Sequence, residues 1–263
     1  MSTPRLAVLS TVERSPAAAA AHDREGWVGL FTADGWVQDP VGSRPHIGRD
    51  QLRRFYDTFI GPRTITFHRD VDIVVGDMVL RDLVLEVAMG PAVTMHIPAV
   101  LRYDVRHDGD ELRIAALRAY WELPAMALQF ARAGVAAAPA GLRLTAALLR
   151  NQGPAGALGF AAGMPGVGAR GKRLLSGLLA DAAAGDEVAV KRRIGAGLQL
   201  TAGDGAPMPQ AELVGLLAGA QTRTLLAVGR YVAARVRGER DVVLIGQFGR
   251  RPTALHRLRV FAE

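Results

Sequence analysis

The sequence predicts an α+β protein made of two related domains, and three observations lead to this prediction. Residues 12–59 show mainly the apolar spacing of helices, with one short strand-like segment among them. Residues 63–121 then form long strand-like runs separated by turn residues. Residues 174–263 repeat this order in a weaker form. Helices followed by a run of antiparallel strands are typical of the α+β class.

Two helices are expected at the start of the first domain, between about Val12 and Leu30. A long alanine run comes first, and polar residues 23–25 then interrupt the apolar surface. We therefore expect a corner near His22, followed by a second helix that carries Trp27.

A strand-like segment, residues 36–38, runs directly into the carboxylate of Asp39. Pro40 ends this strand, because proline has no N–H to give to a ladder. A Gly/Ser/Pro turn follows, and then a helix over residues 49–59. The helix has apolar residues at helical spacing, namely Leu52, Phe55, Tyr56 and Phe59.

The strands of the first domain are expected between residues 63 and 121, with turns at 76–77 and 108–110. The segment after them, residues 124–172, contains no acidic residue and reads as two helices divided by Pro139. Its glycine-rich end, residues 153–171, is expected to be irregular. One interpretation is a helical linker, and the other is a cationic apolar lid or membrane-surface element. The predicted domains are therefore 1–123, a linker over 124–173, and 174–263.

The second domain matches the first in spacing, because residues 186–200 align with residues 23–37. Strands are expected from Arg223 to Phe261, with turns at 238–239 and 250–252. Ala202 falls at the position of Asp39, which predicts a second copy without catalytic function.

Composition excludes several classes of function. The chain of 263 residues has no cysteine, which excludes disulfides and thiol catalysis. Its net charge of +7 is scattered, unlike the clustered basic and aromatic residues of nucleic-acid-binding modules. No apolar run is long enough to span a membrane or act as a signal peptide, so a cytoplasmic protein is expected. His68, His96 and His107 lack metal-ligand spacing, and we expect neither a metal nor a cofactor.

The run FTADGWVQDPVGSRPHIGRDQLRRFY, residues 31–56, resembles the ketosteroid isomerase family in its DPVGS motif and in the final Phe-Tyr pair. The resemblance extends over residues 12–122 and includes LRAYW at 117–121. It implies a cone-shaped fold like that of nuclear transport factor 2, also called SnoaL-like, in which a curved sheet wraps around helices. It also implies that Asp39 is a general base that shifts a double bond beside a ketone. The repeat then predicts a tandem of two such folds.

The other functional positions of this family match only in part. The resemblance gives Tyr56 the role of the supporting tyrosine and places Phe55 and Trp121 in the pocket lining. The family's donor tyrosine falls at Ser15, and its donor aspartate falls at Val100 or Leu101. We count all of these as substrate-contacting positions, but both oxyanion donors are missing, which predicts weak or altered isomerase activity.

Two alternatives stay open at this point. A polyketide-cyclase-like enzyme would also use Asp39 as a lone base, and a non-catalytic scaffold or binder of hydrophobic ligands would keep it only as a relic. The expected partner is a small hydrophobic molecule such as a steroid or polycyclic ketone. Members of the family commonly dimerise through their sheets, so we expect a homodimer or an intramolecular pseudo-dimer formed with the second domain.

Overall fold

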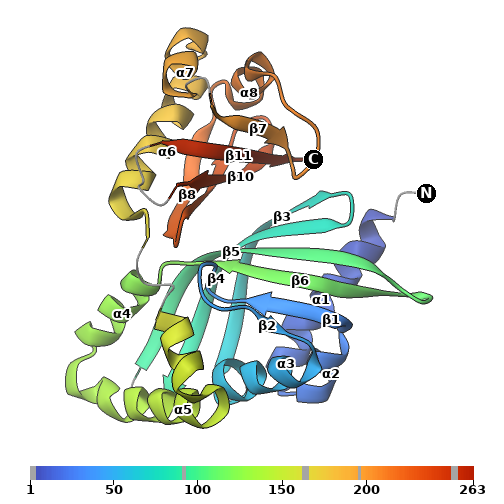
Figure 1. Ribbon diagram of the computed structural model, residues 1–263, viewed down its shortest axis with the longest axis vertical. Helices are drawn as coiled ribbons and strands as arrows, with labels where there is room; N and C mark the ends of the chain where they lie inside the picture. Colours follow the sequence, from blue (N-terminus) through green and yellow to red (C-terminus); the bar gives the residue numbers. More distant parts are fainter. Residues whose placement is uncertain (1–3, 91–92, 162–165, 195–196, 250–253) are drawn as a thin grey trace. The chain divides into compact units, whose positions relative to one another are not determined.

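The computed structural model describes residues 4–90, 93–161, 166–194, 197–249 and 254–263 (Figure 1). Contacts divide the chain into two compact units, Met1–Met164 and Pro165–Glu263, called unit 1 and unit 2 below. The segment predicted as a linker, 124–173, is shared between them, since most of it lies within unit 1 and the rest within unit 2. None of the described helices is both long enough and apolar enough to cross a membrane.

Unit 1 begins with two helices, α1 (Arg5–Ala20) and α2 (Arg24–Gly29). They meet at a corner where His22 has a φ of 53° and the Asp23 side chain accepts a hydrogen bond from the Gly26 amide. The first strand, β1 (Phe31–Gln38), starts five residues earlier than predicted and is followed by β2 (His46–Ile47). Next come helix α3 (Arg49–Phe55) and a π-helical turn, η1 (Tyr56–Ile60).

Four long strands complete the first sheet, namely β3 (Thr64–Val75), β4 (Met78–Gly90), β5 (Val93–Asp108) and β6 (Glu111–Tyr120). The strand order is β2-β1-β6-β5-β4-β3. All neighbouring strands are antiparallel except β1 and β6, which are parallel, so the sheet is mixed.

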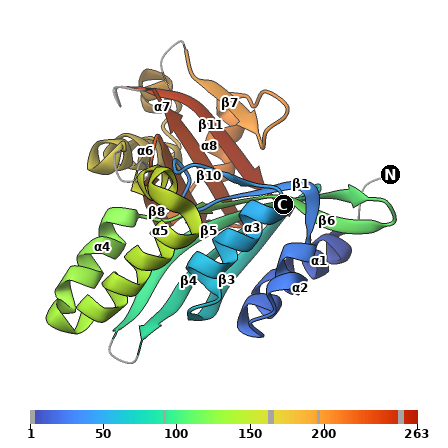
Figure 2. The same ribbon diagram turned by 60° about the horizontal axis from the view of Figure 1, so that its bottom comes forward.

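The core of unit 1 lies between this sheet and the helices that cover one of its faces (Figures 1 and 2). Alternate residues of β5, from Met95 to Tyr103, contribute to that core, as expected for a period of two. Trp27 is almost fully buried and lies 4.8 Å from Phe31 and 5.9 Å from Phe55 between ring centroids. Aromatic packing therefore fills the helical side of the core.

Two further helices belong to unit 1, α4 (Leu123–Arg132) and α5 (Ala138–Ala161), joined by a short 3-10 turn, η2 (Gly134–Ala137). The prediction that residues 153–171 are irregular was wrong for most of the segment. Gly153 kinks α5 with a φ of 67°, but the helix resumes at once. Pro154 is compatible with this restart, because proline is well tolerated in the first turn of a helix.

Unit 2 starts with α6 (Gly168–Ala183) and α7 (Glu187–Ile194), followed by β7 (Gln199–Ala202) and α8 (Gln210–Leu217). Its remaining strands are β8 (Gln221–Val228), β9 (Tyr231–Arg237), β10 (Asp241–Phe248) and β11 (Leu255–Ala262). The order is β7-β11-β10-β9-β8, with β7 parallel to β11 and the other pairs antiparallel. The turn predicted at 250–252 lies outside the described residues. Two mixed sheets with helices confirm the predicted α+β class.

Candidate functional site

Asp39 follows the last residue of β1, where the backbone is fixed on both sides. Gln38 pairs with Arg118 of β6, and the Val41 amide donates to the Ala119 carbonyl at 2.8 Å. The peptide bond between Asp39 and Pro40 is cis. The strand end and the turn after it therefore hold the carboxylate at a defined place beside β6.

The Asp39 carboxylate opens into a cavity of about 110 Å³, called the apolar pocket below. Helix α3 and turn η1 form one wall, strands β3, β4 and β5 form another, and α4 and α5 each add one side chain. The lining residues are Asp39, Phe55, Phe59, Ile60, Arg63, Ile65, Leu85, Val87, Met89, Met95, Ile97, Trp121, Met126 and Leu144. Asp39 and Arg63 are the charged residues of this set. The pocket is therefore apolar, with one carboxylate and one guanidinium in its wall.

Burial controls the chemistry of Asp39. It raises the pKa of the carboxyl to about 6, while the hydrogen bond that Trp121 Nε1 donates to Oδ1 acts in the opposite direction. Asp39 is therefore ionised at neutral pH but binds a proton far more readily than an ordinary aspartate. The Trp121 bond also fixes the orientation of the carboxylate, because one of its two oxygens is held in place.

Arg63 is the charged residue that the sequence did not single out. Its Nη1 donates to the Thr58 carbonyl at 2.6 Å, and its Nε lies 3.1 Å from the sulfur of Met89. Burial lowers the pKa of the guanidinium, and within the described part of the chain no carboxylate pairs with it. A single arginine at the start of a strand gives no recognisable pattern, so only the fold reveals its place in the pocket.

The predicted site residues fall into two groups. Asp39, Phe55 and Trp121 line the apolar pocket together, whereas the remaining four predicted positions do not. Ser15 is buried in α1, where its hydroxyl accepts a hydrogen bond from Trp27 Nε1 at 3.1 Å and also bonds to Tyr103. Tyr56 packs against the Trp27 ring, and its buried hydroxyl has no partner among the described residues.

The two strand positions also lie away from the cavity. Leu101 faces the core from β5 but is not part of the pocket lining. Val100 has the opposite orientation, because successive residues of a strand point to opposite faces. Trp27 is almost fully buried next to Ser15, so the surroundings of Ser15 are packed core.

Metal-binding groups do not converge in the structure. Across the described ranges, no three His, Asp or Glu side chains come together as a metal site would require. His68 Nε2 instead lies 2.7 Å from a carboxylate oxygen of Glu86, on the exposed outer side of β3 and β4.

Comparison with known proteins gives a match for the first unit. Residues 12–117 match the SnoaL-like domain family. Unit 1, with its mixed sheet and the helices on one face of it, is therefore similar to the SnoaL-like domain over these residues.

Several solved structures are similar to the same region. Mycobacterium tuberculosis RV0760c, in complex with estradiol-17beta-hemisuccinate, is 27% identical and is matched over 44% of this chain and 95% of its own, with a TM-score of 0.41. The Delta 5-3-ketosteroid isomerase from Mycobacterium sp. is 29% identical over 45% of this chain and 95% of its own, with a TM-score of 0.41. The epoxide hydrolase/cyclase-like enzyme SalBIII, which has a role in pyran ring formation in salinomycin, is 20% identical. It is matched over 44% of this chain and 92% of its own, with a TM-score of 0.40.

Proposed function

We propose that unit 1 is an isomerase-type enzyme that moves a proton between carbon atoms of a cyclic ketone, with Asp39 as the general base. The observation that supports this most strongly is a single carboxylate, with a pKa of about 6, at the wall of an apolar pocket. A base with a pKa near the working pH is well suited to take a proton and to return it. General-base action of this kind contributes about 10²–10⁴-fold to the rate.

The negative charge that forms on the ketone oxygen needs a stabilising group. Ser15, Val100 and Leu101 do not supply one, since none of them lines the pocket. Arg63 is the cation in the lining, and its guanidinium keeps donors beyond those used for Thr58 and Met89. We assign to Arg63 the stabilisation of the enolate, a role that typically contributes about 10²–10³-fold.

The substrate class follows from the lining. Aliphatic, methionine and aromatic side chains form nearly the whole wall, which favours a steroid or another fused-ring ketone with few polar groups. Pockets for ligands of that size usually enclose about 300–1,000 Å³. Met126 and Leu144 must therefore move outward when such a ligand binds, because they lie on helices and not on the sheet.

A cyclase-type reaction is the second candidate. Ring closure by an enolate starts with the same proton removal by Asp39, and it does not depend on the isomerase donors. The arginine in place of those donors favours this candidate over a strict copy of the ketosteroid isomerase mechanism.

The test uses a β,γ-unsaturated 3-ketosteroid in deuterated buffer. Wild-type protein should form the conjugated enone or exchange the proton next to the ketone, and Asp39→Asn should lose both activities. Asp50→Asn is the matched control, because Asp50 is an exposed acid of α3 outside the pocket. Equal rates for wild type and Asp39→Asn would remove Asp39 from the mechanism. Exchange without isomerisation would favour the cyclase candidate.

A further inference from the structure

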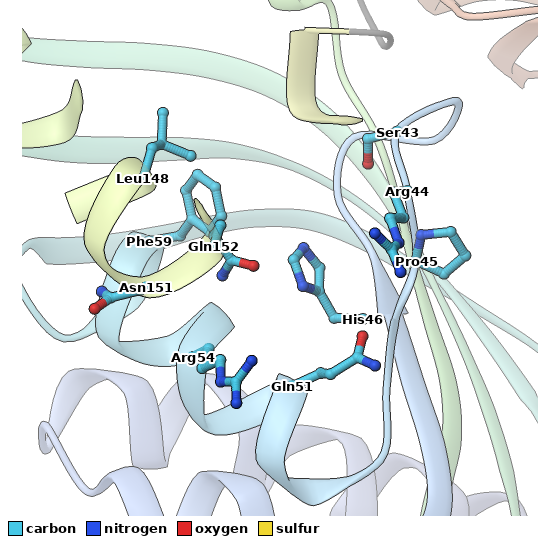
Figure 3. Close-up of a pocket in the computed structure, with 10 residues that line it drawn as sticks. All are labelled: Ser43, Arg44, Pro45, His46, Gln51, Arg54, Phe59, Leu148, Asn151 and Gln152. Atoms are coloured by element: carbon cyan, nitrogen blue, oxygen red, sulfur yellow. The ribbon is translucent and has the colours of Figure 1, made fainter. Parts of the chain in front are cut away.

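Unit 1 has a second cavity, of about 140 Å³, which shares the side chain of Phe59 with the apolar pocket. We call it the polar pocket. It is enclosed by the loop between β1 and β2 with the start of β2, by α3 and η1, and by the part of α5 that precedes the kink at Gly153 (Figure 3). Its lining residues are Ser43, Arg44, Pro45, His46, Gln51, Arg54, Phe59, Leu148, Asn151 and Gln152.

The segments around the polar pocket are held together by hydrogen bonds. The Arg44 amide donates to the Gly159 carbonyl at 3.3 Å, and Gln152 Nε2 donates to Thr58 Oγ1 at 3.3 Å. Figure 3 shows the His46 ring opposite the Gln152 amide, with the Arg54 side chain below them. Side chains from distant parts of the sequence therefore converge on one point.

The pocket is positively charged and has no counter-charge of its own. Arg44 and Arg54 both line it, and no aspartate or glutamate does. Among the residues that the structure describes, neither guanidinium takes part in a hydrogen bond or ion pair. Burial and the nearby charge of Arg44 lower the pKa of His46 to about 4, so that His46 is neutral near pH 7 and the two arginines provide the charge.

Ser43 is a buried polar residue in the wall of the polar pocket. Ser43 is 5% exposed, and its hydroxyl has no hydrogen-bond partner among the residues that the structure describes. Its carbonyl accepts a bond from Gln38 Nε2 at 2.8 Å, which fixes the loop. Buried polar groups are nearly always paired, and a missing partner costs stability. The hydroxyl is itself fully buried, so the exposed guanidinium groups of Arg44 and Arg54 are the donors that an oxyanion in the pocket would meet first.

We propose that the polar pocket binds a carboxylate group of the same ligand whose ring system occupies the apolar pocket. The proposal rests on the proposed function and narrows its substrate class to ring ketones with an acidic side chain. Guanidinium groups suit this role, because their parallel N–H donors match the two oxygens of a carboxylate. Phe59 lines both pockets, so they are neighbours, and a ligand that occupies both has to pass beside this side chain.

The test compares a 3-ketosteroid that carries a carboxylic acid side chain with its methyl ester, by calorimetric titration. Wild-type protein should bind the acid about tenfold more tightly than the ester, which is about 1.4 kcal/mol, the contribution expected of a hydrogen bond to a charged group. Arg44→Gln and Arg54→Gln should each reduce this preference and leave ester binding unchanged. Arg49→Gln is the control, because Arg49 is exposed at the start of the same helix and lies outside both pockets.

The outcomes distinguish the proposed anion site from the proposed enzymatic function. Equal binding of acid and ester, with activity still dependent on Asp39, would overturn the anion site and leave the proposed function standing. An acid preference that survives both arginine variants would also overturn it. An acid preference lost in Arg54→Gln, without activity toward the ketone, would support the polar pocket and count against the enzyme. Binding of neither molecule would overturn both. Circular dichroism of each variant separates loss of binding from loss of folding.

Discussion

The two units of this chain share a strand order and one helix-capping hydrogen bond, yet they differ at the position that we propose as the general base. In each unit one strand runs parallel to its neighbour, and the strands after it are antiparallel in the same order, β1-β6-β5-β4-β3 in unit 1 and β7-β11-β10-β9-β8 in unit 2. Unit 1 adds the short strand β2 outside β1, whereas β7 is itself the edge of its sheet. Asp23 accepts from the Gly26 amide at 2.8 Å at the start of α2. Asp186 accepts from the Ala189 amide at 2.8 Å in front of α7, at the corresponding position.

The difference lies at the end of the parallel strand. In unit 1 this strand ends in Asp39 and a proline turn, whereas in unit 2 it ends in Ala202, paired with Val260. Unit 1 also holds all three tryptophans of the chain, one of which bonds to the acid. The two units therefore differ in one strand-end acid and in the tryptophan that donates to it, and we propose that this difference confines the activity to unit 1. The role of unit 2 as an internal stand-in for a second subunit stays a prediction.

The largest effect should come from exchanging the two strand-end residues. Asp39→Asn should lower the rate of proton exchange by about 10²–10⁴-fold, the usual contribution of a general base. Ala202→Asp should not create activity, because its surroundings lack the tryptophan donor of unit 1. Exchange measured by NMR in deuterated buffer checks both. Activity gained with Ala202→Asp in an Asp39→Asn background would show that unit 2 carries a second pocket.

Truncation of a core residue should distinguish packed core from pocket wall. Leu244 in β10 has no exposed surface, so Leu244→Ala should cost about 2–5 kcal/mol. Leu85 in β4 is half-buried at the wall of the apolar pocket, so Leu85→Ala should cost clearly less. Hydrogen exchange of the β10 and β4 amides measures each unit separately. Equal costs would mean that the apolar pocket is as tightly packed as the core of unit 2.

The pH dependence should reflect the pKa of Asp39. Below about pH 6 the rate should fall about tenfold per pH unit, because the base becomes protonated. The free energy of unfolding should instead increase as the pH falls toward about 3.8. The folded chain holds this proton up to about pH 6 and the unfolded chain only up to about 3.8, so the contribution of Asp39 to stability falls as pH rises between these values. Asp39→Asn should abolish this dependence, and a flat difference between wild type and variant would refute the raised pKa.

The smallest effect should be the same in both units. Asp23→Ala and Asp186→Ala each remove a side-chain acceptor at the start of a short helix. Loss of such a cap typically costs about 1 kcal/mol. Local hydrogen exchange in α2 and α7 provides the measurement, with Asp23→Asn and Asp186→Asn as variants that keep a capping oxygen. Unequal costs would indicate that the two aspartates are not equivalent parts of a repeat.

Much of this architecture could be predicted from local patterns. Alternation and turn residues located β3 to β6, and Pro40 located the end of β1, because these signals act over a few residues. The pocket walls could be predicted only in part. The family resemblance placed Phe55 in the same pocket as Asp39, but nothing in the sequence shows that Trp27 fills the space beside Ser15.

Local sequence patterns could not predict which distant segments meet in the polar pocket. Arg54 and Gln152 are about a hundred residues apart and meet in the polar pocket only because α5 folds back against α3. Sequence reasoning treated residues 124–173 as a linker, because their apolar and cationic composition does not reveal which surface they cover. Contacts that depend on the path of the chain through space require the fold itself.

The cover that α4 and α5 place over the apolar pocket has a consequence for kinetics. The apolar pocket, of about 110 Å³, is smaller than a fused-ring ligand, and we propose that this cover shifts before such a ligand binds. Association would then be governed by this opening, with an observed rate that levels off at high ligand concentration, and the apparent affinity would be reduced by the fraction of open molecules. Substitution of Leu144 by alanine, which thins the cover, should speed ligand entry and exit together.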